Sequence, residues 1–106
     1  MYIHCLEEIE FMPPLIISTV IRVKLEAKHR VCEKEINECF LNHYGTCIED
    51  DREDHKTDPV TNWFIAETNH CRVLKVVFIL RDGNIHIKSA YDAGAKDIAV
   101  YASKNS

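Results

Sequence analysis

One segment constrains the fold more than any other, because residues 74–91, LKVVFILRDGNIHIKSAY, hold an Asp-Gly pair between two alternating apolar runs. Asp-Gly is a strong signal for a two-residue β-hairpin turn, since glycine readily adopts the positive φ that such turns need. With Asp82 and Gly83 at the turn, the pairs are Arg81 with Asn84, Ile79 with His86, Val77 with Lys88 and Lys75 with Ala90. The segment therefore predicts an antiparallel hairpin with a defined register.

This register gives the hairpin one apolar face and one mixed face. The apolar face holds Leu74, Val76, Phe78, Leu80, Ile85, Ile87, Ser89 and Tyr91. Burying its six large aliphatic and aromatic side chains, Leu74 to Ile87, under helices would contribute at most about 1.5–3 kcal/mol each. A slip of one residue would drive Lys75, His86 and Lys88 inward at a large desolvation cost. We therefore expect these three side chains to gather on the outer face of the sheet.

Helices and further strands are predicted on both sides of the hairpin. The predicted strands cover residues 14–18, 46–50, 62–69, 72–80 and 84–91. The predicted helices cover 19–29 after a Ser18 cap, 32–45, and the tail after an Asp92 cap. In the tail, Ile98 and Tyr101 or Ala102 share one side of the helix. Residues 1–12 have no clear pattern, although MYIHC is compatible with a short strand.

The order of these elements predicts an α+β fold. An N-terminal strand, opened by Pro13-Pro14 and therefore placed at an edge, and two helices pack on a curved antiparallel sheet of about four strands. A short C-terminal helix completes the chain. With 106 residues, we expect a single domain with a core over 13–92, a terminal helix and tail over 93–106, and an extension of undefined role at 1–12.

The composition narrows the class of protein. No run of about 18 apolar residues is present and the N-terminus lacks a basic segment, so we expect a cytoplasmic protein without a membrane span or secretory signal. Five cysteines without a CxxC pair argue against a disulfide framework and against a zinc ribbon. The net charge of −4 disfavours nucleic-acid binding by the whole surface, although a local basic patch can still operate.

The chain resembles the BrnT-like toxins of the RelE/ParE superfamily over residues 24–91. The resemblance rests on KLEAKHRVCEKEINECFLN, then a strand, a charged turn and a three-stranded meander that ends in IKSAYDA. The toxins' helix link, Lys-His-Gly-Val, corresponds to residues 28–31, their Phe-Ile-Ala strand to 64–66 and their closing Ser-Ala to 89–90. The resemblance implies a small RelE-like domain, often a ribonuclease that cuts messenger RNA, with an antitoxin as its protein partner.

Two residues depart from the toxin pattern. Arg30 stands where these toxins have a glycine, and Tyr91 stands where they have an arginine that is expected to hold the scissile phosphate. The second departure bears on catalysis more than on the fold.

Metal-independent RNA cleavage needs a base, an acid and a cation for the developing phosphorane charge. We assign Lys75, His86 and Lys88 as candidate catalytic residues, because they are predicted to lie together and imidazole exchanges protons near neutral pH. Candidate substrate-binding residues are Arg52, His55, Arg72, Arg81 and Tyr91. The competing interpretation is that the three catalytic candidates only solvate an amphipathic hairpin.

Several alternatives stay open. The alternatives to an RNA-cleaving toxin are a catalytically inactive module of the same fold that docks a partner helix or strand, and a small hydrolase acting on an ADP-ribose-type phosphate substrate. The acidic loop EDDREDHKTDP lacks the ligand spacing of a calcium site, and Cys47 and Cys71 have no neighbouring base, so we expect no metal, no cofactor and no cysteine nucleophile. Trp63 is predicted to anchor the core or its rim rather than to stack on a base. RNA and an antitoxin-like protein are the expected partners, and a homodimer is compatible with the sequence.

Overall fold

The computed structural model describes residues 14–43, 45–50 and 60–105. Its strands are β1 (Leu15–Ile16), β2 (Ile48–Glu49), β3 (Thr61–Glu67), β4 (Val73–Arg81) and β5 (Asn84–Asp92). Its helical segments are α2 (Thr19–Lys24), the π-helical η1 (Leu25–His29), α3 (Glu33–Asn42) and α4 (Ala95–Lys104). The predicted α+β class is confirmed, and each predicted strand and helix in these ranges has a counterpart within a few residues. The short strand considered for MYIHC lies outside the described residues.

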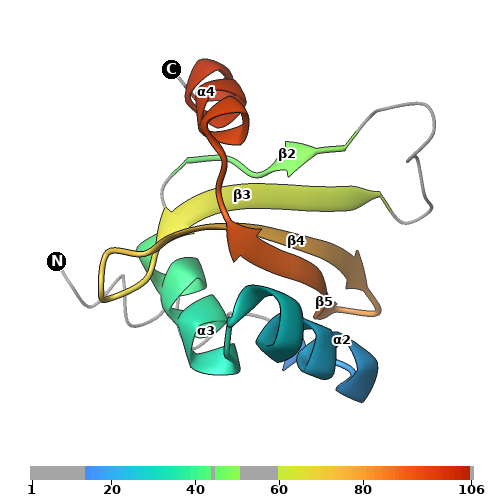
Figure 1. The fold of residues 1–106 in the computed structure, drawn as a ribbon. Coiled ribbons are helices and arrows are strands. Elements are labelled where there is room, and N and C mark those ends of the chain that lie inside the picture. The colour runs from blue at the N-terminus through green and yellow to red at the C-terminus, as the bar shows by residue number, and fades with distance from the viewer. Residues whose placement is uncertain (1–13, 44, 51–59, 106) are drawn as a thin grey trace, which may run out of the picture.

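The described strands form one sheet in the order β1-β5-β4-β3-β2. It is mixed rather than purely antiparallel, because β1 joins the edge of β5 in parallel and adds a fifth strand to the predicted four. The proline-led segment is therefore an edge strand, as expected from its missing backbone donor. Helices α2 and α3 lie on one side of the sheet and α4 lies on the other (Figure 1).

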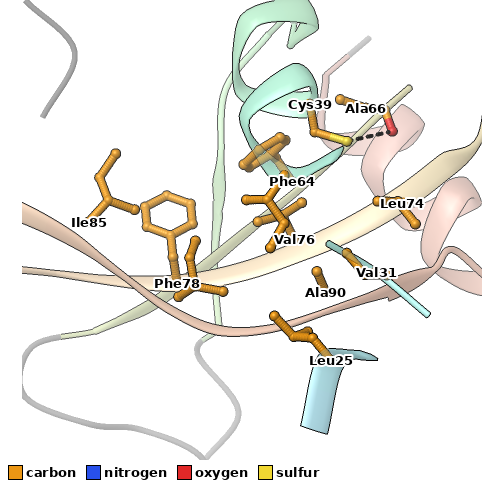
Figure 2. Packing of buried hydrophobic residues seen from close by; sticks show 12 residues of the cluster. Leu25, Val31, Cys39, Phe64, Ala66, Leu74, Val76, Phe78, Ile85 and Ala90 are labelled. Carbon is orange, nitrogen blue, oxygen red and sulfur yellow. Dashed lines mark hydrogen bonds between the residues drawn. The ribbon is translucent and has the colours of Figure 1, made fainter. Parts of the chain in front are cut away.

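The core lies between the sheet and α3 with η1. Its fully buried side chains include Val31 and Ile36 from the helical layer and Phe64, Leu74 and Val76 from the strands. Figure 2 shows Val31, Phe64, Leu74 and Val76 in this core, and it shows Cys39, whose thiol donates to the carbonyl of Ala66 at 3.6 Å. Leu80 was predicted to join this core, but it is 50% exposed because it lies near the hairpin end of β4.

The hairpin register is correct near the turn and wrong beyond it. Arg81 pairs with Asn84 and Ile79 with His86 as predicted, but a bulge at Lys88 shifts the following pairs by one residue. Val77 therefore faces Ser89, and Lys75 faces Tyr91 rather than Ala90. The shift inserts the small side chain of Ala90 into the core, where it is fully buried, and turns the larger, polar Tyr91 to the opposite face of the sheet.

The helix caps are partly as predicted. The Ser18 hydroxyl accepts from the Ile21 N–H at 3.2 Å, which confirms the first cap. Asp92 does not cap the last helix, because it belongs to β5 and pairs with Arg72, while Gly94 holds the cap position of α4. Ile98 of α4 is exposed, whereas Tyr101 contacts the core.

Arg30 ends η1 in the left-handed conformation, with φ of 54°. A non-glycine residue pays about 1–2 kcal/mol for this conformation, and helix ends of this kind favour glycine. We expect Arg30→Gly to raise the free energy of unfolding by about 1 kcal/mol, measured by urea denaturation. Lys28→Gly, inside η1, should lower it by about the same amount. Equal destabilisation by both changes would contradict the assignment of strain to Arg30.

Candidate functional site

Lys75 is the centre of the polar cluster on the sheet face opposite the core. Its ammonium lies 3.1 Å from the Asp97 carboxylate of α4 and 4.3 Å from the centre of the Trp63 ring on β3. Its side chain is only 15% exposed. The cation is thus held by an ion pair and by a cation–π contact, and it is largely shielded from solvent.

Tyr91 lies beside Lys75 because of the bulge. The Lys75 Nζ is 5.8 Å from the centre of the Tyr91 ring, across the pair that the two residues form between β4 and β5. The His29 ring also lies next to Tyr91, with ring centroids 5.5 Å apart and an interplanar angle of 44°. A histidine, a tyrosine, a lysine, a carboxylate and a tryptophan therefore form one cluster, which we call the Lys75 cluster: His29, Tyr91, Lys75, Asp97 and Trp63.

The Arg72 guanidinium fixes the segment that carries His29. It donates to the carbonyl oxygens of His29 and Arg30, at 2.7 Å each, and to the carboxylates of Glu35 and Asp92. The hydrogen bond from Arg72 lowers the pKa of Asp92, and the same bond raises the pKa of Arg72. Arg72 was predicted to bind substrate; in the structure its donors are directed at the protein itself, where they hold the end of η1 against α3 and β5.

An open groove of about 220 Å³ adjoins the cluster between α4 and the sheet. Its charged lining comprises Lys75, Lys96 and Lys104 together with Glu49, Asp50 and Asp97. The apolar rings and side chains of Trp63, Ile48 and Val100 complete it. Since cations and carboxylates are balanced, the groove has no strong preference for an anion along its whole length.

His43, which follows α3, holds α4 against the core. Its Nε2 lies 2.7 Å from the Tyr101 hydroxyl, and its ring packs on Phe64 with a centroid distance of 4.3 Å. Burial lowers the pKa of His43, and burial, followed by the nearby Cys47, raises the pKa of Tyr101. Both groups are therefore held in their neutral forms.

Stability should consequently fall in mild acid. Below the ordinary histidine pKa of 6.5, His43 binds a proton in the unfolded chain but stays neutral in the folded protein until its lower folded pKa is reached. The stability that His43 contributes is therefore fully present above pH 6.5 and is lost as the pH falls through its folded pKa. We expect His43→Gln to flatten the decline in unfolding free energy between pH 8 and pH 5, measured by urea denaturation. Identical pH slopes for both proteins would contradict a buried neutral His43.

Apart from Tyr91, the sequence-predicted site residues that the structure describes do not join Lys75. His86 shares its sheet face but pairs with Ile79, four residues along β4 from Lys75, which corresponds to about 13 Å of strand. Lys88 is exposed at the bulge and Arg81 is exposed at the hairpin end. Arg52 and His55 lie outside the described residues. Among the predicted site residues within the described ranges, only Lys75 and Tyr91 come together.

His29 and Asp97 were not predicted as site residues. His29 is 62 positions from Tyr91 in the sequence, and only the helix link Lys-His, noted for the family resemblance, pointed to it. Trp63 is buried, which agrees with its predicted role as an anchor. Burial raises the pKa of Cys39 to about 12, so this thiol is unsuited to nucleophilic chemistry.

Within the described ranges, no three His, Cys, Asp or Glu side chains are grouped closely enough to hold a metal ion. In the same part of the chain no helix has the length and apolar character needed to cross a membrane. No model of a known protein family matches this chain, and no curated protein matches its sequence.

Proposed function

We propose that this protein is a RelE/BrnT-like domain of the toxin-antitoxin type that binds RNA at the Lys75 cluster and cleaves it without a metal ion. The observation that carries the proposal is the pairing of Lys75 with Tyr91, the residue at the position of the toxins' phosphate-holding arginine. The Lys75 ammonium, 5.8 Å from the Tyr91 ring, supplies a cation next to that position. A lysine from the neighbouring strand thus substitutes for the missing arginine.

The chemistry of the cluster supports this assignment. A cation held in a partly desolvated site stabilises the developing charge of a phosphorane more strongly than a solvated one does. Asp97 neutralises Lys75 in the free protein, so a bound phosphate would compete with the Asp97 carboxylate for the ammonium. His86 and Lys88 lie further along β5, where they would contact an extended RNA backbone rather than the reacting phosphate.

The test is induced expression of wild type and variants, with growth and cellular RNA integrity followed. Lys75→Ala and Tyr91→Ala should reduce RNA cleavage by about 10²–10³-fold, as expected for loss of one transition-state contact. Lys34→Ala, an exposed lysine of α3, is the matched control and should cleave as wild type does. Thermal melts of the purified variants establish that each is folded. Harmless wild-type protein that leaves RNA intact would overturn the ribonuclease proposal.

The second candidate is a catalytically inactive protein-binding module of the same fold. The ion pair between Lys75 and Asp97 favours it, because a lysine that is 15% exposed and already neutralised contributes to the stability of α4 without any ligand. In that case wild type would leave RNA intact, and Lys75→Ala would change only the stability of the protein. No arrangement among the described residues favours hydrolysis of an ADP-ribose linkage.

A further inference from the structure

We infer that His29 is the residue that takes up the proton of the attacking 2′-hydroxyl at the Lys75 cluster, an inference that rests on the proposed ribonuclease function. His29 was not among the predicted catalytic residues. Its ring contacts the ring of Tyr91, and the Tyr91 ring in turn lies next to the Lys75 ammonium. Among the histidines that the structure describes, it is the one in ring contact with Tyr91.

The backbone around His29 is unusual in two independent ways. Residues Leu25–His29 form a π-helical turn, a rare element that is frequently found at functional sites. The next residue, Arg30, adopts a left-handed conformation that costs a non-glycine residue about 1–2 kcal/mol. The Val31 N–H donates to the Leu25 carbonyl oxygen at 3.1 Å, across the whole segment. The His29 ring at the end of this segment lies against the ring of Tyr91 on β5.

The segment is held in place by the Arg72 guanidinium. The carbonyl oxygens of His29 and Arg30, at the end of η1, each accept a hydrogen bond from it at 2.7 Å. Glu35 and Asp92 fix the guanidinium in turn. The charged and titratable groups that face His29 are therefore Tyr91 and Asp92 of β5 and Arg72, which directly precedes β4, with Lys75 on the far side of Tyr91 in the cluster. Arg72 is a positioning residue, because it acts on the backbone of His29 and not on its ring.

The proposed step conserves atoms and protons. The 2′-oxygen attacks the adjacent phosphorus as its proton passes to the His29 imidazole, so that a bond from the 2′-oxygen to phosphorus forms. The bond from phosphorus to the 5′-oxygen breaks, and the Tyr91 hydroxyl gives its proton to the leaving oxygen. The His29 imidazolium then returns a proton to the Tyr91 phenolate. The products are a 2′,3′-cyclic phosphate and a 5′-hydroxyl.

The experiment measures cleavage of a short single-stranded RNA by the purified full-length protein across pH 5 to 9. His29→Ala should reduce the rate by about 10²–10⁴-fold and should remove the acid limb of the pH profile. Added imidazole should restore part of the lost rate, a rescue that a purely structural role would not produce. His70→Gln, at an exposed turn histidine, is the control and should keep the wild-type rate and profile.

Three results would overturn the inference, and they differ from one another. If wild type cleaves RNA but His29→Ala keeps its rate and pH profile, His29 has no part in the reaction and the proposed function stands. If His29→Ala loses activity without rescue by imidazole, and a melt shows a loosened fold, the residue is structural. Failure of wild type to cleave RNA at any pH overturns the proposed function itself, and the assigned step with it.

Discussion

Arg72→Met is expected to lower the free energy of unfolding by about 2–4 kcal/mol, although the change keeps most of the apolar stem of the side chain. The Arg72 side chain is 26% exposed, and its guanidinium joins the end of η1, the first turn of α3 and the end of β5 through hydrogen bonds to His29, Arg30, Glu35 and Asp92. Methionine would leave two carboxylates without their cation and two carbonyls without their donor. A charged hydrogen bond lost in this way costs more than a neutral one.

Urea denaturation measures this effect, and a melting temperature lowered by roughly 10 °C or more would accompany it. Arg81→Met is the matched control, because Arg81 is exposed near the hairpin turn and should change stability by no more than about 0.5 kcal/mol. Arg72→Lys should fall between the two, since an ammonium cannot reproduce the planar fork of donors. Equal stability of Arg72→Met and Arg81→Met would show that the hydrogen bonds of Arg72 contribute nothing to the free energy of unfolding.

The hairpin shows which parts of the register the sequence could predict. The Asp-Gly turn determines the pairs next to it, because a two-residue turn leaves one register for Arg81 with Asn84 and Ile79 with His86. Beyond Lys88 the pattern Ser-Ala-Tyr has no large aliphatic residue to decide which side chain points inward. Which side chain points inward depends on the space beneath α3 and η1, and this space accepts Ala90. The size of that space is set by the packing of the helices on the sheet and not by the local sequence.

The candidate site could be predicted only in part for a related reason. Alternation placed Lys75 on the outer face correctly, but the same reasoning placed Tyr91 on the inner face and Lys88 opposite Val77. The cluster depends on the bulge, on the ring of His29 from a distant helix and on Asp97 from α4. Contacts over such separations leave no local periodicity, because each partner satisfies its own helix or strand pattern independently.

Phe64→Ala should produce the largest loss of stability among single core changes considered for the sheet, about 3–5 kcal/mol. Its side chain is fully buried, and its ring centroid lies 4.8 Å from that of Phe40 and 4.3 Å from that of His43. The cavity would open on β3 at the place where α3 packs. His43, which contacts Tyr101 of α4, packs at the same place. Leu80→Ala is the control, because the 50% exposure of Leu80 limits its cost to about 1 kcal/mol. Comparable losses for both variants in urea denaturation would mean that the hydrophobic core extends to the hairpin end, as the alternation alone had predicted.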